Sequence, residues 1–219
     1  MGQEIDLMRN YPVSKRNLEK RAASRSEEDR QIARLFGKEF FDGDRKYGYG
    51  GYNYNPRFWQ PIVPDFQKYY SLTAESSILD VGCGKGFMLY DFMQLIPGIT
   101  VAGIDISQYA ISNAMEEMKP FVQVGNAKEL PFEDNSFDLV ISITTIHNLE
   151  RNECRNALLE LERVSSNNKF ITVDAHHNDE EKRRMDMWNL TALTYMSTQD
   201  WKIFFDDSHY TGASFWFIP

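Results

Sequence analysis

One carboxylate and three glycines, closely spaced at the end of an apolar run, are the residues best placed to do chemistry. The stretch LDVGCGKGF (79–87) ends a short β-rich run at Asp80 and then places Gly82, Gly84 and Gly86 at every second position. Glycine lets a backbone approach a ligand closely, and the start of a following helix attracts a carboxylate. The spacing differs from the G-x-G-x-x-G of dinucleotide sites, and Asp80 would repel a phosphate but attract an ammonium or a sulfonium. The loop therefore favours a ligand that carries both a cation and an amino-acid end.

Two further polar positions follow the next apolar runs. Asp105 ends TVAGID (100–105), 105 − 80 = 25 positions after Asp80, and its carboxylate can accept hydrogen bonds from both hydroxyls of a ribose. Asn126 and Ala127 follow FVQVG (121–125) and offer an amide and backbone N–H groups to the edge of an adenine. Ligands of open α/β sheets bind outside the carboxyl ends of the strands, so these positions predict a nucleoside-containing ligand.

Apolar runs and amphipathic stretches alternate along most of the chain, and this alternation predicts the fold. Strands are expected at 77–81, 100–105, 121–125, 137–143, 169–175 and 212–219, and helices at 87–96, from the Ser107 cap to about 118, at 153–164 and within 179–208. Strands that alternate with helices of this length imply right-handed crossovers and a parallel sheet. The expected fold class is α/β, a doubly wound Rossmann-like and mostly parallel sheet.

The N-terminal part has a different character. Residues 14–36 predict one or two polar helices, the second opened by Ser26 and Asp29 as an imperfect capping box and stopped by Gly37. The stretch KYGYGGYNYNPRFW (46–59) suits neither a helix nor a strand, because glycine weakens both. We therefore expect an N-terminal helical and Tyr/Gly-rich segment over 1–72 and the main domain over 73–219.

Composition narrows the classes of function and partner. The net charge is −8, and because the first 35 residues carry eight Lys/Arg against six Asp/Glu, the remainder carries −8 − 2 = −10. An acidic body of this kind argues against a nucleic-acid partner. No apolar run is long enough to span a bilayer, which argues against a membrane partner. Cys83 and Cys154 match no zinc or disulfide spacing, so we expect a reducing, cytoplasmic location and no metal.

The three motifs together carry a resemblance to a known family. With LDVGCGKG, GIDIS and LPFEDNSFDLV in order over roughly residues 75–175, the chain resembles the class I S-adenosylmethionine-dependent methyltransferases, in particular those that act on small molecules. The resemblance implies S-adenosylmethionine as cofactor, and a sugar or natural-product intermediate is the acceptor that the acidic body and aromatic segment suggest. It implies these cofactor contacts: Asp80, Gly82, Cys83 and Gly84 at the methionine part, Asp105 at the ribose, Ile106, Asn126 and Ala127 at the adenine, and Ile143 on the route to the methyl group.

The sequence departs from the family pattern at two points. Many relatives have Asp where Asn126 stands, and Asn accepts the adenine amino proton equally well. The family sheet normally ends in an antiparallel hairpin of two strands, whereas this chain offers a single final strand. The far edge of the sheet is therefore left open by the sequence.

The aromatic segment is interpreted as a lid. In the resembled family the segment before the first strand commonly folds over the cofactor, so Tyr49 and Tyr52 are expected to contact it through rings and hydroxyls. The alternative is an aromatic loop that only packs the N-terminal helices on the sheet. Lys85, inside the glycine loop, is expected to point to solvent, and Cys83 is expected to be a small filler rather than a nucleophile.

His147 and His176 are the candidate catalytic residues, because each follows a predicted strand on the ligand-binding edge. Either histidine could instead only hold its loop in place, and the chemistry needs a base only if the acceptor must lose a proton.

Two other classes of function stay open: an NAD(P)-dependent oxidoreductase and a non-catalytic binder of S-adenosylmethionine. A DNA amino-methyltransferase is disfavoured, because SITTIHN (142–148) stands where such enzymes have an Asn/Asp-Pro-Pro-aromatic set. The mixed-charge run over 15–30 is expected to be a solvated helical face, with a homodimer contact as the alternative.

Overall fold

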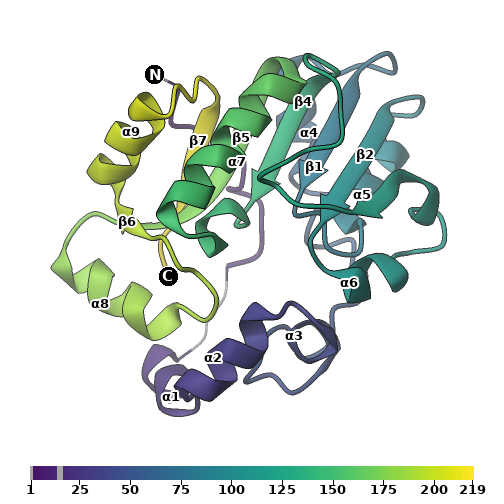
Figure 1. Cartoon of the computed structure of the whole chain (residues 1–219). Coiled ribbons are helices and arrows are strands. Elements are labelled where there is room, and N and C mark those ends of the chain that lie inside the picture. The colour runs from purple at the N-terminus through teal and green to yellow at the C-terminus, as the bar shows by residue number, and fades with distance from the viewer. Residues whose placement is uncertain (1, 14–16) are drawn as a thin grey trace.

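A parallel sheet forms the centre of the molecule, with β1 and β4 in its middle (Figure 1). The computed structural model describes residues 2–13 and 17–219. Within these residues the sheet has seven strands in the order β3-β2-β1-β4-β5-β6, and β7 also pairs with β5. The strands are β1 Ser77–Val81, β2 Thr100–Asp105, β3 Val122–Val124, β4 Phe137–Ile143, β5 Ser165–His176, β6 Met196–Ser197 and β7 Ala213–Phe217.

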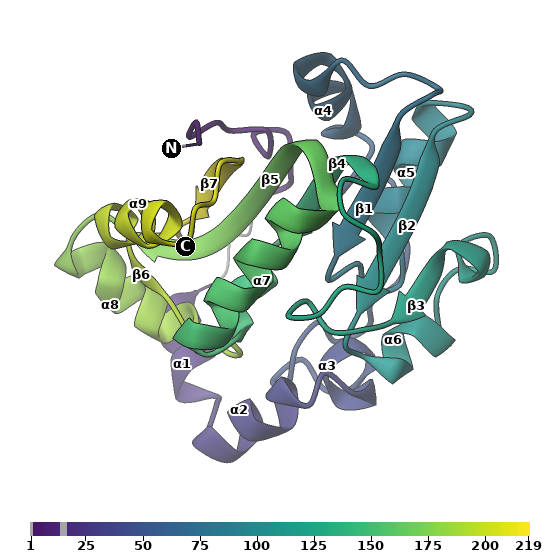
Figure 2. The ribbon, with the colours of Figure 1, turned by 45° about the horizontal axis from the view of Figure 1, so that its top comes forward.

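Helices cover both faces of this sheet (Figures 1 and 2). They are α1 Leu18–Ala23, α2 Glu27–Arg34, α3 Lys38–Asp42, α4 Val63–Tyr70, α5 Phe87–Leu95, α6 Gln108–Ser112, α7 Arg151–Val164, α8 Asp179–Trp188 and α9 Thr198–Asp207, with short 3₁₀ turns η1 Lys119–Phe121 and η2 Ile146–Asn148. Among the described residues, no helix combines the length and the apolarity that crossing a membrane requires.

Two apolar cores lie on opposite faces of the sheet, because successive side chains of a strand point to opposite sides. Ile78 of β1 joins the core under α4 and α5, which also contains Phe92 and Phe170. Leu79, the next residue, joins the core under α7 and α9, which contains Leu158 and Trp201. The central strands are therefore buried on both faces, as a parallel sheet with helices on each side requires.

The predicted doubly wound α/β fold is confirmed, and β1, β2 and β4 have the predicted bounds. The far edge differs from the family pattern: β7 runs parallel to β5, with Thr172 opposite Phe215. The physical reason is the connection, since α9 lies between β6 and β7 and reverses the chain before β7 begins. A tight hairpin, which an antiparallel edge would need, does not precede β7.

Two predicted helices are shorter than expected. The helix capped by Ser107 ends at Ser112, because the backbone N–H of Asn113 turns back onto the carbonyls of Ala110 and Tyr109. The predicted helical region 179–208 is divided into α8 and α9. Asn189 ends α8 by accepting the N–H of Ala192 and donating to its carbonyl oxygen, a local turn that competes with the helix.

The N-terminal helices α1, α2 and α3 lie below the carboxyl ends of the strands (Figure 1). Ser26 and Asp29 form a complete capping box at the start of α2, as predicted. Gly37 does not end α2; it precedes α3, and Phe36 makes the turn with a left-handed φ of 48°. The part of the predicted helical region at 14–16 lies outside the described residues, and the division into 1–72 and 73–219 stays a prediction.

The first residues of the chain extend the sheet beyond β7. The N–H of Ile5 donates to the carbonyl of Ser214, and the N–H of Ser214 donates to the carbonyl of Gln3, each at 3.0 Å. Glu4 thereby forms a parallel bridge with Ser214. The outer edge of β7 is covered by this pairing, which satisfies backbone groups that an open edge would expose.

The burial of α7 on one face predicts different losses of stability for two neighbouring leucines of this helix. Leu158 is fully buried and Leu159 is 44% exposed. We expect Leu158→Ala to lower the free energy of unfolding by about 2–5 kcal/mol, because it removes buried methyl groups and leaves a cavity. Leu159→Ala, the matched control, should change it by less than about 0.5 kcal/mol. Urea unfolding followed by circular dichroism measures both, and equal losses would contradict the assigned helix face.

Candidate functional site

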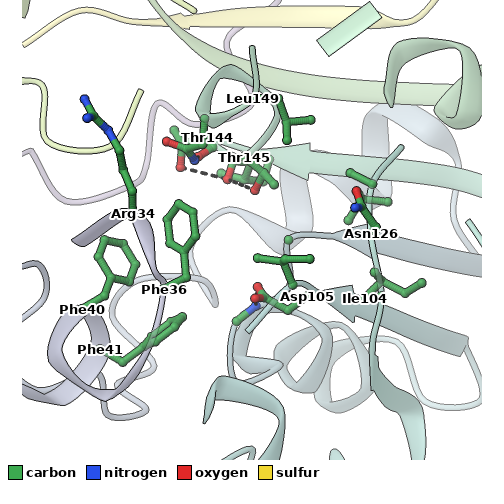
Figure 3. A pocket seen from close by; sticks show the side chains of 18 of the residues that line it. Arg34, Phe36, Phe40, Phe41, Ile104, Asp105, Asn126, Thr144, Thr145 and Leu149 are labelled. Carbon is green, nitrogen blue, oxygen red and sulfur yellow. Dashed lines mark hydrogen bonds between the residues drawn. The ribbon is translucent and has the colours of Figure 1, made fainter. Parts of the chain in front are cut away.

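A cavity of about 330 Å³ lies between the carboxyl ends of β1, β2 and β4 and the N-terminal part that contains α2 and α3 (Figure 3). Parallel strands end on the same side of a sheet, so residues distant in sequence meet there. The cavity is lined by Arg34, Phe36, Phe40, Phe41, Tyr49, Tyr52, Val81, Gly82, Gly84, Ile104, Asp105, Ile106, Gly125, Asn126, Ala127, Lys128, Ile143, Thr144, Thr145, Asn148 and Leu149.

This lining contains most of the residues singled out from the sequence. All of the predicted cofactor-binding residues except Asp80 and Cys83 are among them. Those two are buried beside the loop, 5% exposed each, rather than on the cavity wall. The structure thus brings the predicted set together, while the role of each residue in binding stays a prediction.

The glycine loop is held against the end of β2. The N–H groups of Gly82 and Cys83 both donate to the carbonyl of Ile104, at 2.7 and 3.0 Å. Gly82 adopts a φ of 94°, and a Cβ at this position would overlap the side chain of Thr145. Only glycine meets both the left-handed backbone and the close approach of Thr145.

Asp105 connects the same loop to the helix that follows β2. Its Oδ2 accepts the N–H of Gly84 at 2.7 Å, and its Oδ1 accepts the N–H of Ser107 at 2.8 Å. Burial raises the pKa of Asp105, and these two N–H donors partly oppose the rise. Each carboxylate oxygen keeps a second lone pair on the cavity side, so the group can still accept from a diol.

Asp80 lies behind the loop as a buried acid without a compensating charge. Among the described residues, none donates a hydrogen bond to its carboxylate. Burial, and secondly the charge of Asp105, raise the pKa of Asp80 to about 8. Two neighbouring acids with no cation between them fit a ligand that brings a positive charge to the loop. Asp80 would act on that charge through the loop, because its side chain does not line the cavity.

The wall beyond Asp105 offers an apolar surface and an amide. Ile106 is 56% exposed and faces the cavity, which leaves an aliphatic side chain free to pack on a flat ring. Asn126 Oδ1 accepts the N–H of Lys128 at 3.0 Å, so its amide is oriented by the protein. With Asp105, these residues fit an adenosine group.

Lys85 contradicts its sequence prediction, because it is 6% exposed rather than solvated. Its Nζ pairs with Asp42 Oδ2 at 2.7 Å and donates to the carbonyl of Tyr52 at 2.8 Å. Asp42 also accepts the hydroxyl of Tyr109 and the N–H of Tyr52. Asp42 and Tyr52, the two partners of Lys85, belong to the N-terminal part, so nothing in the local sequence around Lys85 predicts them.

Aromatic rings pack over the loop beside this ion pair. Tyr49 and Tyr52 have ring centroids 4.3 Å apart, and Tyr52 lies 4.9 Å from Phe87 at the start of α5. A Cβ on Gly84 would lie 3.2 Å from the Tyr52 ring. Burial raises the pKa of the Tyr52 phenol, so it stays neutral and can donate a hydrogen bond. The packing suits both a lid and a fixed cover, and the lid stays a hypothesis.

The predicted catalytic histidines are not on the cavity wall. His147, in η2, is 4% exposed, and its Nδ1 accepts the backbone N–H of Asp174 at 2.9 Å. Burial lowers the pKa of His147, and the nearby charge of Asp174 raises it by less, so the ring is neutral. Because Nδ1 accepts a hydrogen bond, the proton of the neutral ring is on Nε2. His176 ends β5, also outside the cavity lining. Catalytic roles for both histidines stay predictions.

Residues that the sequence did not single out line the other end of the cavity. Arg34 ends α2, Thr144 and Asn148 follow β4, and Phe36 precedes α3 (Figure 3). Phe36 and Thr144 both have left-handed backbones, with φ of 48° and 50°. Left-handed backbones in residues other than glycine are concentrated at functional sites. They cannot be read from the sequence, so they identify these residues only in the structure.

Comparison with known proteins gives one family. Residues 79–173 match the family described as methyltransferase domain. The demethylmenaquinone methyltransferase of Symbiobacterium thermophilum is 31% identical over 126 residues, covering 53% of this chain and 49% of that protein. The tRNA (carboxymethyluridine(34)-5-O)-methyltransferase of Arabidopsis thaliana is 30% identical over 132 residues, covering 60% of this chain and 31% of that protein. The chain thus spans about half or less of the length of these curated relatives.

Solved structures agree in fold. A structure described as a SAM dependent methyltransferase from Aquifex aeolicus superposes with a TM-score of 0.51 at 21% identity, covering 67% of this chain and 78% of that one. At this identity the likeness concerns the fold, including the central sheet that carries the cavity.

The raised pKa of Asp80 predicts a pH-dependent stability for the ligand-free protein. The unfolded chain releases this proton near pH 4, whereas the folded protein keeps it until about pH 8. The contribution of Asp80 to stability is therefore complete below about pH 4 and is lost as the pH rises towards 8. Asp80→Asn should flatten this fall in thermal midpoint between pH 5 and 8. Asp206→Asn, an exposed control on α9, should leave the slope unchanged, and an unaltered slope in Asp80→Asn would refute the assignment.

The Lys85 contacts predict how the N-terminal cover is held. Lys85→Met removes two charge-assisted hydrogen bonds, so we expect amide hydrogen exchange in residues 42–55 to accelerate by about tenfold or more. Exchange in β1 and β4 should stay slow. Lys182→Met serves as the control, because Lys182 pairs with Asp186 on the exposed face of α8, away from the cavity. Unchanged exchange in residues 42–55 would mean that the aromatic packing alone holds the cover.

Proposed function

We propose, from the premise that this chain belongs to the class I S-adenosylmethionine-dependent methyltransferase family, that it transfers a methyl group to a small-molecule acceptor. The match of residues 79–173 to the methyltransferase-domain family confirms the family predicted from the sequence, whose methyl donor is S-adenosylmethionine. The observation that carries the proposal is the pair of buried acids, Asp80 and Asp105, at the ends of two adjacent strands beside a glycine loop. The pair favours a cationic nucleoside over a phosphorylated one.

The residues of the donor end take distinct roles in this proposal. Asp105 accepts from the ribose hydroxyls, Ile106 packs on the adenine, and Asn126 and Ala127 bind its edge. The glycine loop lets the backbone reach the methionine part, and Tyr52 closes over it. The donor, when bound, supplies a methyl group already activated on a sulfonium, so the chain itself has to orient the acceptor and exclude water.

The volume of the cavity, about 330 Å³, supports a small acceptor. Phe36, Phe40 and Tyr49 of the N-terminal part cover it, and Thr144 and Leu149 form the opposite wall. The plant relative named above methylates tRNA, but this chain has a net charge of −8, which disfavours tracking a phosphate backbone. A sugar or natural-product intermediate stays within this proposal.

We assign His147 a positioning role. Its Nδ1 is occupied by the N–H of Asp174, and its carbonyl accepts the N–H groups of Leu193 and Thr194. These bonds connect the turn after β4 to β5 and to the segment before β6. The turn carries Thr144 and Asn148, so His147 would act by fixing these residues rather than by taking a proton.

A cytoplasmic location is also proposed. Cys83 and Cys154 are both buried free thiols, which suits a reducing compartment.

Calorimetric titration tests the proposed donor. S-adenosylmethionine and its demethylated product should both bind the wild-type protein, and NADH should give no heat. Asp105→Asn should weaken both nucleosides by about tenfold or more, because it removes a charged acceptor of the ribose hydroxyls. Asp206→Asn, a control with the same change in charge, should bind normally. Binding of NADH without either nucleoside would favour an oxidoreductase, and donor binding without turnover on any acceptor would favour a non-catalytic binder.

A further inference from the structure

Arg34 presents an unused hydrogen-bonding edge at the acceptor end of the cavity. It is the last residue of α2, lines the cavity, and has a side chain 28% exposed. Its Nη1 pairs with Glu27 Oε1 at 2.9 Å. The opposite edge, made of Nε and Nη2, has no partner among the described residues, and Nε is buried. This edge of a guanidinium matches the two oxygens of a carboxylate.

Asn148, which lines the same cavity, has an unused acceptor. Its Nδ2 donates to the carbonyl of Thr144 at 3.2 Å, which orients the amide. Its Oδ1 is then left buried without a partner within the described part of the chain. A buried oxygen of this kind requires a donor, such as a hydroxyl or an N–H group. A ligand in this part of the cavity would therefore need one carboxylate and one hydrogen-bond donor.

Mainly apolar side chains lie near Arg34. Figure 3 shows Phe36 and Phe40 beside the stem of Arg34, and Leu149 and the hydroxyl-bearing Thr144 farther across. Phe36 and Thr144 both adopt a left-handed φ, of 48° and 50°. A ligand with a short apolar body fits between them.

The surrounding charge selects a monoanion. Lys128, the other cation of the lining, has its Nζ paired with Glu153. Arg34 itself is partly neutralised by Glu27, and the whole chain carries −8. Because the guanidinium is already partly compensated, a monoanion leaves less excess negative charge in this acidic protein than a phosphate dianion would.

We propose that the acceptor is a small carboxylic acid that also carries a hydroxyl or amino group, with its carboxylate bound by the Nε and Nη2 edge of Arg34 and its donor group facing Asn148. The proposal rests on the methyltransferase function proposed above and names the substrate class of that site. Arg34 would determine specificity for the acceptor, at a distance from the residues assigned to the donor.

Matched pairs of probes test the proposal. The probes are 3-hydroxybenzoate with 3-hydroxybenzamide, and 3-hydroxybutyrate with 3-hydroxybutyramide, titrated into the full chain saturated with S-adenosylhomocysteine and followed by ligand-observed NMR. In at least one pair the acid should bind about tenfold or more tightly than its amide. Arg34→Gln should remove that preference and leave the amide affinity and the S-adenosylhomocysteine affinity unchanged. Arg34→Lys should restore part of it, and Arg183→Gln, an exposed charge-matched control, should bind like the wild type.

The contrary outcomes are distinguishable. If S-adenosylhomocysteine binds but neither acid is preferred over its amide, the carboxylate assignment fails while the proposed methyltransferase function stands. Tighter binding of 3-hydroxyphenyl phosphate than of either acid would also overturn it. If Arg34→Gln weakens acid and amide equally, Arg34 has a structural role and the assignment fails. Absence of S-adenosylhomocysteine binding in the wild type would overturn both proposals together.

Discussion

The carboxylate of Asp105 is the constraint on which the geometry of the site depends. It accepts one N–H from the loop after β1 and one from the residue that caps α6. The carbonyl of Ile104 adds two more bonds to the same loop. A glycine-rich turn would otherwise sample many conformations, and the three bonds donated by Gly82, Cys83 and Gly84 favour one of them. This arrangement has an electrostatic cost, because Asp105 and Asp80 are buried close together and no described cation neutralises them. A cationic ligand would offset that cost.

The N-terminal part is joined to the site rather than appended to it. Lys85 belongs to the glycine loop, yet both of its partners come from the segment before β1. A second contact, between the Tyr54 hydroxyl and the buried carboxylate of Asp91 at 2.6 Å, joins the same segment to α5. The loop that would hold the donor therefore also anchors the cover of the cavity.

The sequence predicted the parts of the structure that local patterns determine. Strands β1, β2 and β4 followed from apolar runs, and the start of α2 followed from Ser26 and Asp29. The donor end of the cavity was predicted because its residues sit in short motifs directly after strands. Lys85 was predicted wrongly, because its partners lie some forty residues away in sequence and carry no local signal. Arg34 and Asn148 were missed for the same reason, since a polar residue in a helix or a turn becomes informative only once its neighbours are known.

The pairing of Gln3 and Ile5 with Ser214 has a consequence for the order of folding. Residues 3–5 are synthesised more than two hundred residues before their partner strand. During synthesis, residues 3–5 therefore stay unpaired until β7 has been made, and the central strands can assemble without them. Completion of this edge of the sheet is thus a late event in folding, because it requires β7.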